Sequence, residues 1–341
     1  MLSTYKHNLA WGALTALLLL RPGVGRTQEA VAPEDLRKEV LASKKKPDGW
    51  TYNINLGATG AMNTASDVIG TTDGTTAQIG GVVDGAATWT RDRQELRSTL
   101  RLQYAQTRTP ALDAFVKSAD VIDLGSVWMY RLSALDWVGP YARARAMSQM
   151  TDGYLMRAAP TTVVRTTTSS GTTKGEVAAK ERIALAGGFD PLLIAESAGA
   201  FANPIESKAL TIKAKIGVGA QHFLTDGGFA VADDAKTAEL ELKQLASSHQ
   251  AGGVFELQAD GAATEQISWK GQASVFAPLY SSTSTATGMD AMSYELLAGV
   301  SVKLSSWASL DYVVTARRLP AILDKWQTQS NLLFTTGFKV P

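Results

Sequence analysis

Residues 50–59 read WTYNINLGAT, a stretch in which every second side chain is apolar. Successive side chains of an extended strand point to opposite sides, so the apolar residues share one face and the residues between them share the other. The apolar face is formed by Trp50, Tyr52, Ile54, Leu56 and Ala58. This pattern predicts a β-strand that is apolar on one side only.

The same alternation recurs along the rest of the chain. It predicts further strands at residues 77–90, 94–106, 118–132, 137–150, 178–202, 208–222, 251–261, 264–276, 291–304, 308–318 and 327–339. The segment 178–202 is the least regular, because it is long and contains Pro191, and it could hold a bulge or two strands. We therefore expect an all-β fold of about twelve strands.

The predicted connections alternate in length. Short connections lie around residues 91–92, 135–136, 204–205, 261–262 and 306–307. Long connections rich in Thr, Ser, Gly and Asp, which we expect to be solvated and mobile, lie at residues 60–76, 107–117, 151–177, 223–250, 277–290 and 319–326. Short periplasmic turns that alternate with long extracellular loops are typical of a single antiparallel transmembrane β-barrel. A soluble β-sandwich has no reason to sort its loops in this way.

Charged side chains share one face of each predicted strand. Lys213 and Lys215, for example, alternate with Ile212, Ala214 and Ile216. Because a Lys or Arg at the lipid midplane costs about 2–4 kcal/mol, we expect the charged face to point into the lumen. The lumen-facing candidates are Arg97, Arg101, Arg143, Arg145, Lys213, Lys215, Glu256, Lys270, Glu295 and Asp311. Basic residues outnumber acidic ones, so an open lumen would attract small anionic solutes; the alternative is a packed plug of salt bridges.

Aromatic residues occur near the ends of several predicted strands. Trp50, Trp89, Trp128 and Tyr130 fall near the periplasmic ends, and Phe338 lies in the last strand. Trp and Tyr concentrate at membrane–water interfaces, so these residues are candidates for contact with outer-membrane lipid. Ordinary packing of strand aromatics is the alternative.

Two parts of the chain resemble known outer-membrane proteins. Residues 331–341, NLLFTTGFKVP, resemble the C-terminal recognition strand of outer-membrane barrels, although three residues follow Phe338 here. This resemblance implies contact with the barrel-assembly machinery during insertion. Residues 100–132 and 141–154 resemble the strand-loop-strand core of uncharacterised Gram-negative outer-membrane β-barrels related to the salt-induced outer membrane proteins. In that pattern a Lys-Ser/Thr-x-Asp segment, here residues 117–120, opens the strand after an extracellular loop. The resemblance implies a barrel in the outer membrane and brings no catalytic or binding residue.

The N-terminus predicts export. Lys6 and His7 precede an apolar run at residues 9–20, and residues 23–25 supply small side chains for cleavage after Gly25. The alternative, a membrane anchor, needs about 20 apolar residues, and this run is shorter. We therefore expect a signal peptide at residues 1–25, a periplasmic lead-in at 26–49 that is a short helix or flexible, and a barrel at 50–341.

The composition argues against several classes of function. The 341 residues contain no cysteine, and a net charge of +1 without a basic stripe is unsuited to nucleic acid. His222 and His249 lack the spacing of metal ligands, and Ser247, Ser248 and His249 lack an orienting partner for catalysis. We therefore expect no enzyme, no cofactor and no bound metal.

Two functions fit this sequence best. One is a small-solute pore or binding channel with a polar, mildly basic lumen. The other is a closed structural or interaction barrel that docks a partner or presents Thr/Ser-rich surface loops. A soluble periplasmic β-protein is a third reading.

Overall fold

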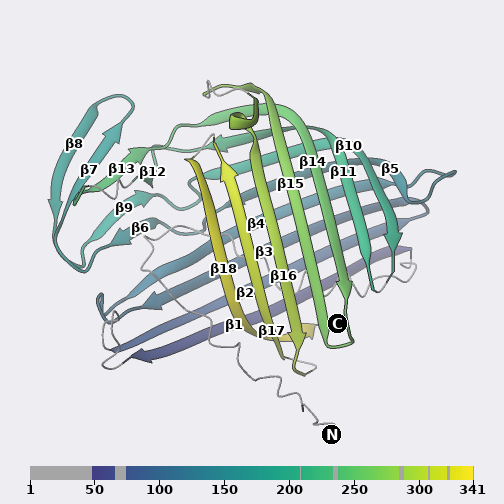
Figure 1. The fold of residues 1–341 in the computed structure, drawn as a ribbon, viewed down its shortest axis with the longest axis horizontal. Coiled ribbons are helices and arrows are strands. Elements are labelled where there is room, and N and C mark those ends of the chain that lie inside the picture. Colours follow the sequence, from purple (N-terminus) through teal and green to yellow (C-terminus); the bar gives the residue numbers. More distant parts are fainter. Residues whose placement is uncertain are drawn as a thin grey trace, which may run out of the picture.

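The computed structural model describes residues 48–65, 74–207, 209–232, 237–283, 288–305, 308–320 and 323–340. Twelve long strands form one closed antiparallel barrel (Figure 1). In chain order these strands are β1 (Gly49–Ala65), β2 (Gly74–Arg91), β3 (Gln94–Arg108), β4 (Phe115–Tyr130), β5 (Val138–Ser148), β10 (Leu192–Glu206), β11 (Thr211–Leu224), β14 (Ser248–Ala262), β15 (Ile267–Ser281), β16 (Ser293–Lys303), β17 (Ala308–Leu319) and β18 (Leu323–Val340). The predicted all-β fold, a single antiparallel barrel of about twelve strands, is confirmed.

The barrel closes between its first and last strands. Residues 54–58 of β1 pair with residues 336–340 of β18. By contrast, β1 and β2 pair along their whole length, from residue 49 to residue 65 of β1. The predicted signal peptide and residues 26–47 of the predicted lead-in lie outside the described residues.

The segment predicted at residues 178–202 holds two strands, which is one of the alternatives left open for it, and not one continuous strand. The barrel strand there is β10, which begins at Leu192, and residues further upstream form the separate short strand β9 (Arg182–Ala186). Pro191 has no N–H to donate to a sheet ladder, which explains why the barrel strand starts directly after it. Because β10 continues through a bulge at residues 202–205, the turn predicted at 204–205 lies further along, before β11.

Two of the long connections contain ordered strands, so the expectation of solvated, mobile loops is wrong for them. The connection from β5 to β10 contains β6 (Gly153–Met156), β7 (Thr161–Thr167), β8 (Gly171–Val177) and β9. The connection from β11 to β14 contains β12 (Phe229–Val231) and β13 (Leu240–Gln244). Strands β12, β13, β7 and β8 form one small sheet and β6 pairs with β9 in another, both at one end of the barrel (Figure 1). We call these six strands the loop subdomain.

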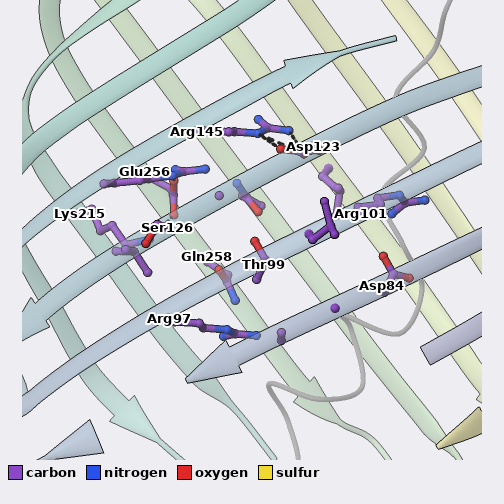
Figure 2. Close-up of a pocket in the computed structure, with 18 of the residues that line it drawn as sticks. Asp84, Arg97, Thr99, Arg101, Asp123, Ser126, Arg145, Lys215, Glu256 and Gln258 are labelled. Atoms are coloured by element: carbon purple, nitrogen blue, oxygen red, sulfur yellow. Dashed lines mark hydrogen bonds and ion pairs between the residues drawn. The ribbon is translucent and has the colours of Figure 1, made fainter. Parts of the chain in front are cut away.

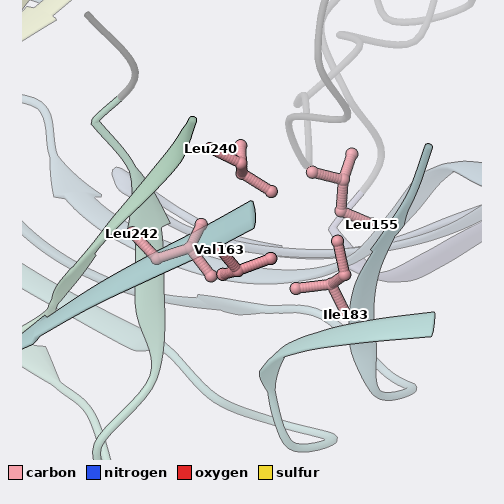
Figure 3. Packing of buried hydrophobic residues seen from close by; sticks show 5 residues of the cluster. All are labelled: Leu155, Val163, Ile183, Leu240 and Leu242. Carbon is pink, nitrogen blue, oxygen red and sulfur yellow. The ribbon is translucent and has the colours of Figure 1, made fainter. Parts of the chain in front are cut away.

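The loop subdomain has a hydrophobic core of its own. Five buried side chains from both connections form one cluster: Leu155, Val163, Ile183, Leu240 and Leu242 (Figure 3). Leu240 and Leu242 of β13 lie beside β7, with which β13 pairs in parallel. The apolar contact between two loops that are distant in sequence explains why these segments are folded.

The backbones of β10 and β11 approach each other closely at one point. Gly199 and Gly217 lie opposite each other across these strands. A Cβ atom at Gly199 would overlap the carbonyl oxygen of Ile216, and a Cβ atom at Gly217 would overlap that of Ala198. Glycine therefore permits a close approach of the two backbones that no other residue allows. On either side of this pair of strands lie β5 and β14.

The two faces of the wall differ in polarity. On β11 the outward side chains of Ile216 and Val218 are 63% and 68% exposed. On β14, Phe255 is exposed outside, whereas Glu256 and Gln258 are buried inside. An apolar outer face around a polar interior is the arrangement of transmembrane barrels. The 3-10 turn η1 (Gly288–Ala291) precedes β16. Within the described ranges, no helix is long and apolar enough to cross a membrane.

Candidate functional site: the charged lumen

The interior of the barrel holds a cavity of about 240 Å³. Ten charged side chains line it, six of them basic and four acidic, and together they come from β2 to β5, β11 and β14 to β16 (Figure 2). They are Arg97, Arg101, Arg143, Arg145, Lys215, Lys270, Asp84, Asp123, Glu256 and Glu295. The cavity thus has a surplus of positive charge.

Eight of the ten lumen candidates from the sequence line this cavity, and two do not. Lys213 lies one inward position away from Lys215, where its Nζ is 3.8 Å from Asp260 Oδ1. Asp311 is fully buried and accepts a hydrogen bond from Ser309 Oγ at 2.8 Å. Both lie nearer the short-turn end of their strands, which explains their absence from the cavity.

Several uncharged polar residues of the cavity were not among the candidates. Thr99, Gln258 and Gln272 line it, each two positions from a charged lining residue. The alternation of strand side chains was sufficient to find them, because residues two apart share a face. The search for charge alone left them out.

Strand register places opposite charges side by side around the cavity. Arg101 on β3 lies between Asp84 on β2 and Asp123 on β4. Asp123 also accepts two hydrogen bonds from Arg145, one from Nε at 2.9 Å and one from Nη2 at 2.6 Å. Cross-strand pairs of this kind stabilise a sheet, so part of the charge in the lumen is neutralised locally.

A second group of charges joins strands that are not neighbours in the barrel. Arg143 Nη1 on β5 donates to Glu256 Oε2 on β14 at 2.7 Å. Lys215 Nζ on β11 donates to the other oxygen, Oε1, at 2.6 Å. The small inward residues Ser197 on β10 and Gly219 on β11 lie in the register row between Arg143 and β14, which leaves room for the arginine to reach across these two strands. We call these three residues the Glu256 cluster.

A smaller cavity of about 90 Å³ adjoins the first and shares Arg145 and Glu295 with it. It lies toward the loop end of the barrel. Five apolar side chains contribute to its lining, namely Met147, Leu193, Ala195, Phe223 and Leu319. The lumen is therefore less charged toward the loops than at its centre.

A fully buried ion pair lies at the loop end of β4. Lys117 Nζ donates to Asp120 Oδ2 at 2.8 Å and to the carbonyl oxygen of Asp152 at 2.8 Å. Asp120 also accepts hydrogen bonds from the backbone N–H groups of Met150 and Thr151, both at 2.9 Å. These contacts attach the start of the loop subdomain to the barrel wall. We call this group the rim clamp.

The aromatic candidates lie together near the short-turn end of the first strands. Trp50, Trp89 and Trp128 occupy one register row across β1, β2 and β4, with Leu96 of β3 between the last two. Trp50 is 52% exposed, and the ring of Trp128 stacks on Tyr130 with centroids 6.5 Å apart. The side chain of Phe338 lies outside the described part of the structure.

The residues considered for catalysis or metal binding are arranged differently from what their spacing suggests. Strand pairing places His222 opposite His249, with their Nδ1 atoms 2.9 Å apart. Glu196 Oε1 lies 3.5 Å from Nε2 of His222. Ser248 is buried on the inner face whereas His249 points outward, so these neighbours do not meet. Among the described residues, no group of three or more His, Cys, Asp or Glu is placed to hold a metal ion.

Neither a protein-family model nor a curated protein matches the chain. The resemblance to the salt-induced outer membrane proteins therefore stays a prediction.

Solved structures with a similar fold are outer-membrane β-barrels. The translocator domain of the autotransporter NalP from Neisseria meningitidis matches with a TM-score of 0.41 and 11% identity, over 89% of this chain and 93% of that one. An outer membrane channel from Pseudomonas putida F1 matches with a TM-score of 0.40 and 11% identity, over 91% and 100%. The β domain of the Bordetella autotransporter BrkA matches with a TM-score of 0.35 and 12% identity, over 86% and 100%. The likeness concerns architecture alone.

Proposed function

We propose that the chain is a channel of the bacterial outer membrane that passes small solutes through a polar, mildly basic lumen. The observation that carries this proposal is the 240 Å³ interior cavity with six basic and four acidic side chains, enclosed by a wall with exposed apolar residues outside. Polar interiors of this kind line water-filled channels. A surplus of positive charge favours entry of small anions.

The same proposal includes an orientation of the barrel in the outer membrane. Residues 1–25 act as a cleaved signal peptide, residues 26–49 remain in the periplasm, and the short turns face the same side. The register row of Trp50, Trp89 and Trp128 then lies at the periplasmic lipid interface, where aromatic rings are favoured. The barrel-assembly machinery would insert the folded wall into the outer membrane.

Reconstitution into planar lipid bilayers tests the proposal. The full mature chain should give ionic conductance in potassium chloride. Its folded form should migrate differently on a gel before and after boiling in SDS. If protein that migrates differently before and after boiling gives no conductance in the bilayer, the open channel is rejected. Recovery in the soluble fraction without detergent would instead support a soluble β-protein.

A second candidate is a closed barrel that docks a partner or presents its surface loops. It is favoured by two observations: the opposite charges paired in register inside the lumen, and the folded loop subdomain with its own core. A stoichiometric partner that copurifies with the full chain, together with a silent bilayer record, would support this candidate.

A further inference from the structure

We propose that the Glu256 cluster is a binding site for small oxyanions, and that a carboxylate or phosphate group passes the lumen by taking the place of Glu256 beside Arg143. This inference rests on the proposed channel function and names the solute class and the residues that select it.

The geometry of the cluster supports an exchangeable partner. Glu256 accepts one hydrogen bond on each carboxylate oxygen, from Arg143 at 2.7 Å and from Lys215 at 2.6 Å. Two cations thus share one anion, so the cluster carries a net positive charge. A guanidinium presents a planar fork of donors that matches carboxylate and phosphate oxygens. The cluster already binds one carboxylate, and its chemistry suits another.

The three side chains of the Glu256 cluster differ in solvent exposure. The side chain of Arg143 is 33% exposed, compared with 8% for Glu256 and 17% for Lys215. Arg143 is therefore the member that a solute in the cavity reaches first. Glu256 can keep Lys215, its partner on the neighbouring strand, when Arg143 turns to the solute.

The surroundings favour an anion at this place. Arg97, Arg101 and Arg145 line the same cavity as Arg143 (Figure 2). Arg145 stands two residues from Arg143 on the same face of β5 and is bound by Asp123. An oxyanion that leaves Arg143 therefore remains within a field of further arginines, of which Arg145 is paired with Asp123. A solute passes through a channel only if it binds well enough to enter and weakly enough to leave.

The test measures the chloride-to-potassium permeability ratio and the block of chloride current by potassium acetate or potassium phosphate in planar bilayers. Wild-type protein should prefer chloride and should be blocked by either oxyanion. Glu256→Gln keeps the shape of the side chain and frees both cations. It should raise the permeability ratio about fivefold, which corresponds to one unit charge at about 4 Å in water.

Arg143→Met should lower the permeability ratio and abolish the oxyanion block. Lys213→Met is the matched control, because it removes the same charge from a lumen-facing position of β11 that does not line the cavity. The control should leave the block unchanged. Block of the chloride current by both acetate and phosphate supports a site for oxyanions in general. Block by only one of them identifies the chemical group that the site prefers.

A cysteine variant keeps the proposal testable if the charge variants fail to insert. The chain has no cysteine, so Arg143→Cys offers one thiol that is modified after the barrel has formed. A positively charged methanethiosulfonate reagent should restore the block and a negatively charged one should not. Conductance with unchanged ratio and block in all variants would overturn the oxyanion site alone. A silent wild-type record would overturn both the site and the channel.

Discussion

The rim clamp and the Glu256 cluster both hold a buried carboxylate, but the donors differ. Asp120 is held by two backbone N–H groups besides Lys117 and the hydroxyl group of Thr151. Glu256 is held by two side chains, Arg143 and Lys215. Backbone donors are fixed in place, whereas side-chain donors can turn to another acceptor. The comparison separates a carboxylate that fixes structure from one that a solute can replace.

Removal of Asp120 should have the largest effect on stability. Asp120→Ala leaves the buried ammonium of Lys117 without its counter-charge and frees two backbone donors, which costs about 3–5 kcal/mol. The free energy of unfolding in detergent, measured with guanidinium, checks this. Asp113→Ala serves as the control, because it removes an exposed carboxylate from the connection between β3 and β4. A loss below about 1 kcal/mol would contradict the structural role of the clamp.

A change in the core of the loop subdomain should have a large but local effect. Leu242 is 1% exposed, so Leu242→Ala should cost about 2–5 kcal/mol within that subdomain. We expect faster proteolysis between residues 225 and 247 while the boiled and unboiled gel bands stay as in wild type. Leu279→Ala, at a side chain that is 89% exposed, is the matched control. Loss of the folded band would show that barrel and loops unfold together.

A methyl group at the close approach of β10 and β11 tests how the Glu256 cluster is assembled. Gly217→Ala places a Cβ against the carbonyl of Ala198, and the overpacking should cost about 1–3 kcal/mol. Because the two strands must separate, Arg143 should lose Glu256, and the permeability ratio should move as in Glu256→Gln. Gly253→Ala is the control, since no atom lies within 4 Å of the added Cβ. An unchanged permeability ratio in Gly217→Ala would mean that the close approach of β10 and β11 does not position Arg143.

The smallest effect is expected at an exposed carboxylate. A hydrogen bond from Arg108, and then its positive charge, hold the pKa of Asp113 below the ordinary value. A carboxyl whose pKa is lowered by folding contributes stability above its unfolded pKa and loses it as the pH falls through the folded pKa. Wild type should therefore be slightly more stable than Asp113→Asn at about pH 7, and the difference should shrink as the pH falls below about 4. A difference that grows on acidification would contradict the ion pair.

The barrel itself could be predicted from the sequence, because alternation in strands such as residues 50–59 reports directly which face is apolar. The same period identified Arg143, Lys215 and Glu256 as members of one charged face. It could not pair Arg143 with Glu256, since that contact reaches across two other strands, β10 and β11, and alternation within one strand does not report it.

The loop subdomain could not be predicted in the same way. Its Thr- and Ser-rich segments, such as residues 163–176, have the composition of solvated loops. Their order comes from Leu240 and Leu242, which lie in a different connection and become neighbours of β7 only in the folded chain. The contact of His222 with His249 has the same origin, because strand pairing and not spacing brings the two rings together.

The seam between β1 and β18 sets the order in which the wall is completed and undone. In the described chain this seam has five residue pairs, at residues 54–58, whereas β1 and β2 share seventeen. Every other ladder joins strands that are closer in sequence and can form as hairpins or neighbours during insertion, while the seam must wait for both ends of the chain. The amide hydrogens of residues 54–58 that point toward β18 should therefore exchange sooner than those of β2 and β3, and lateral opening of the barrel should begin there.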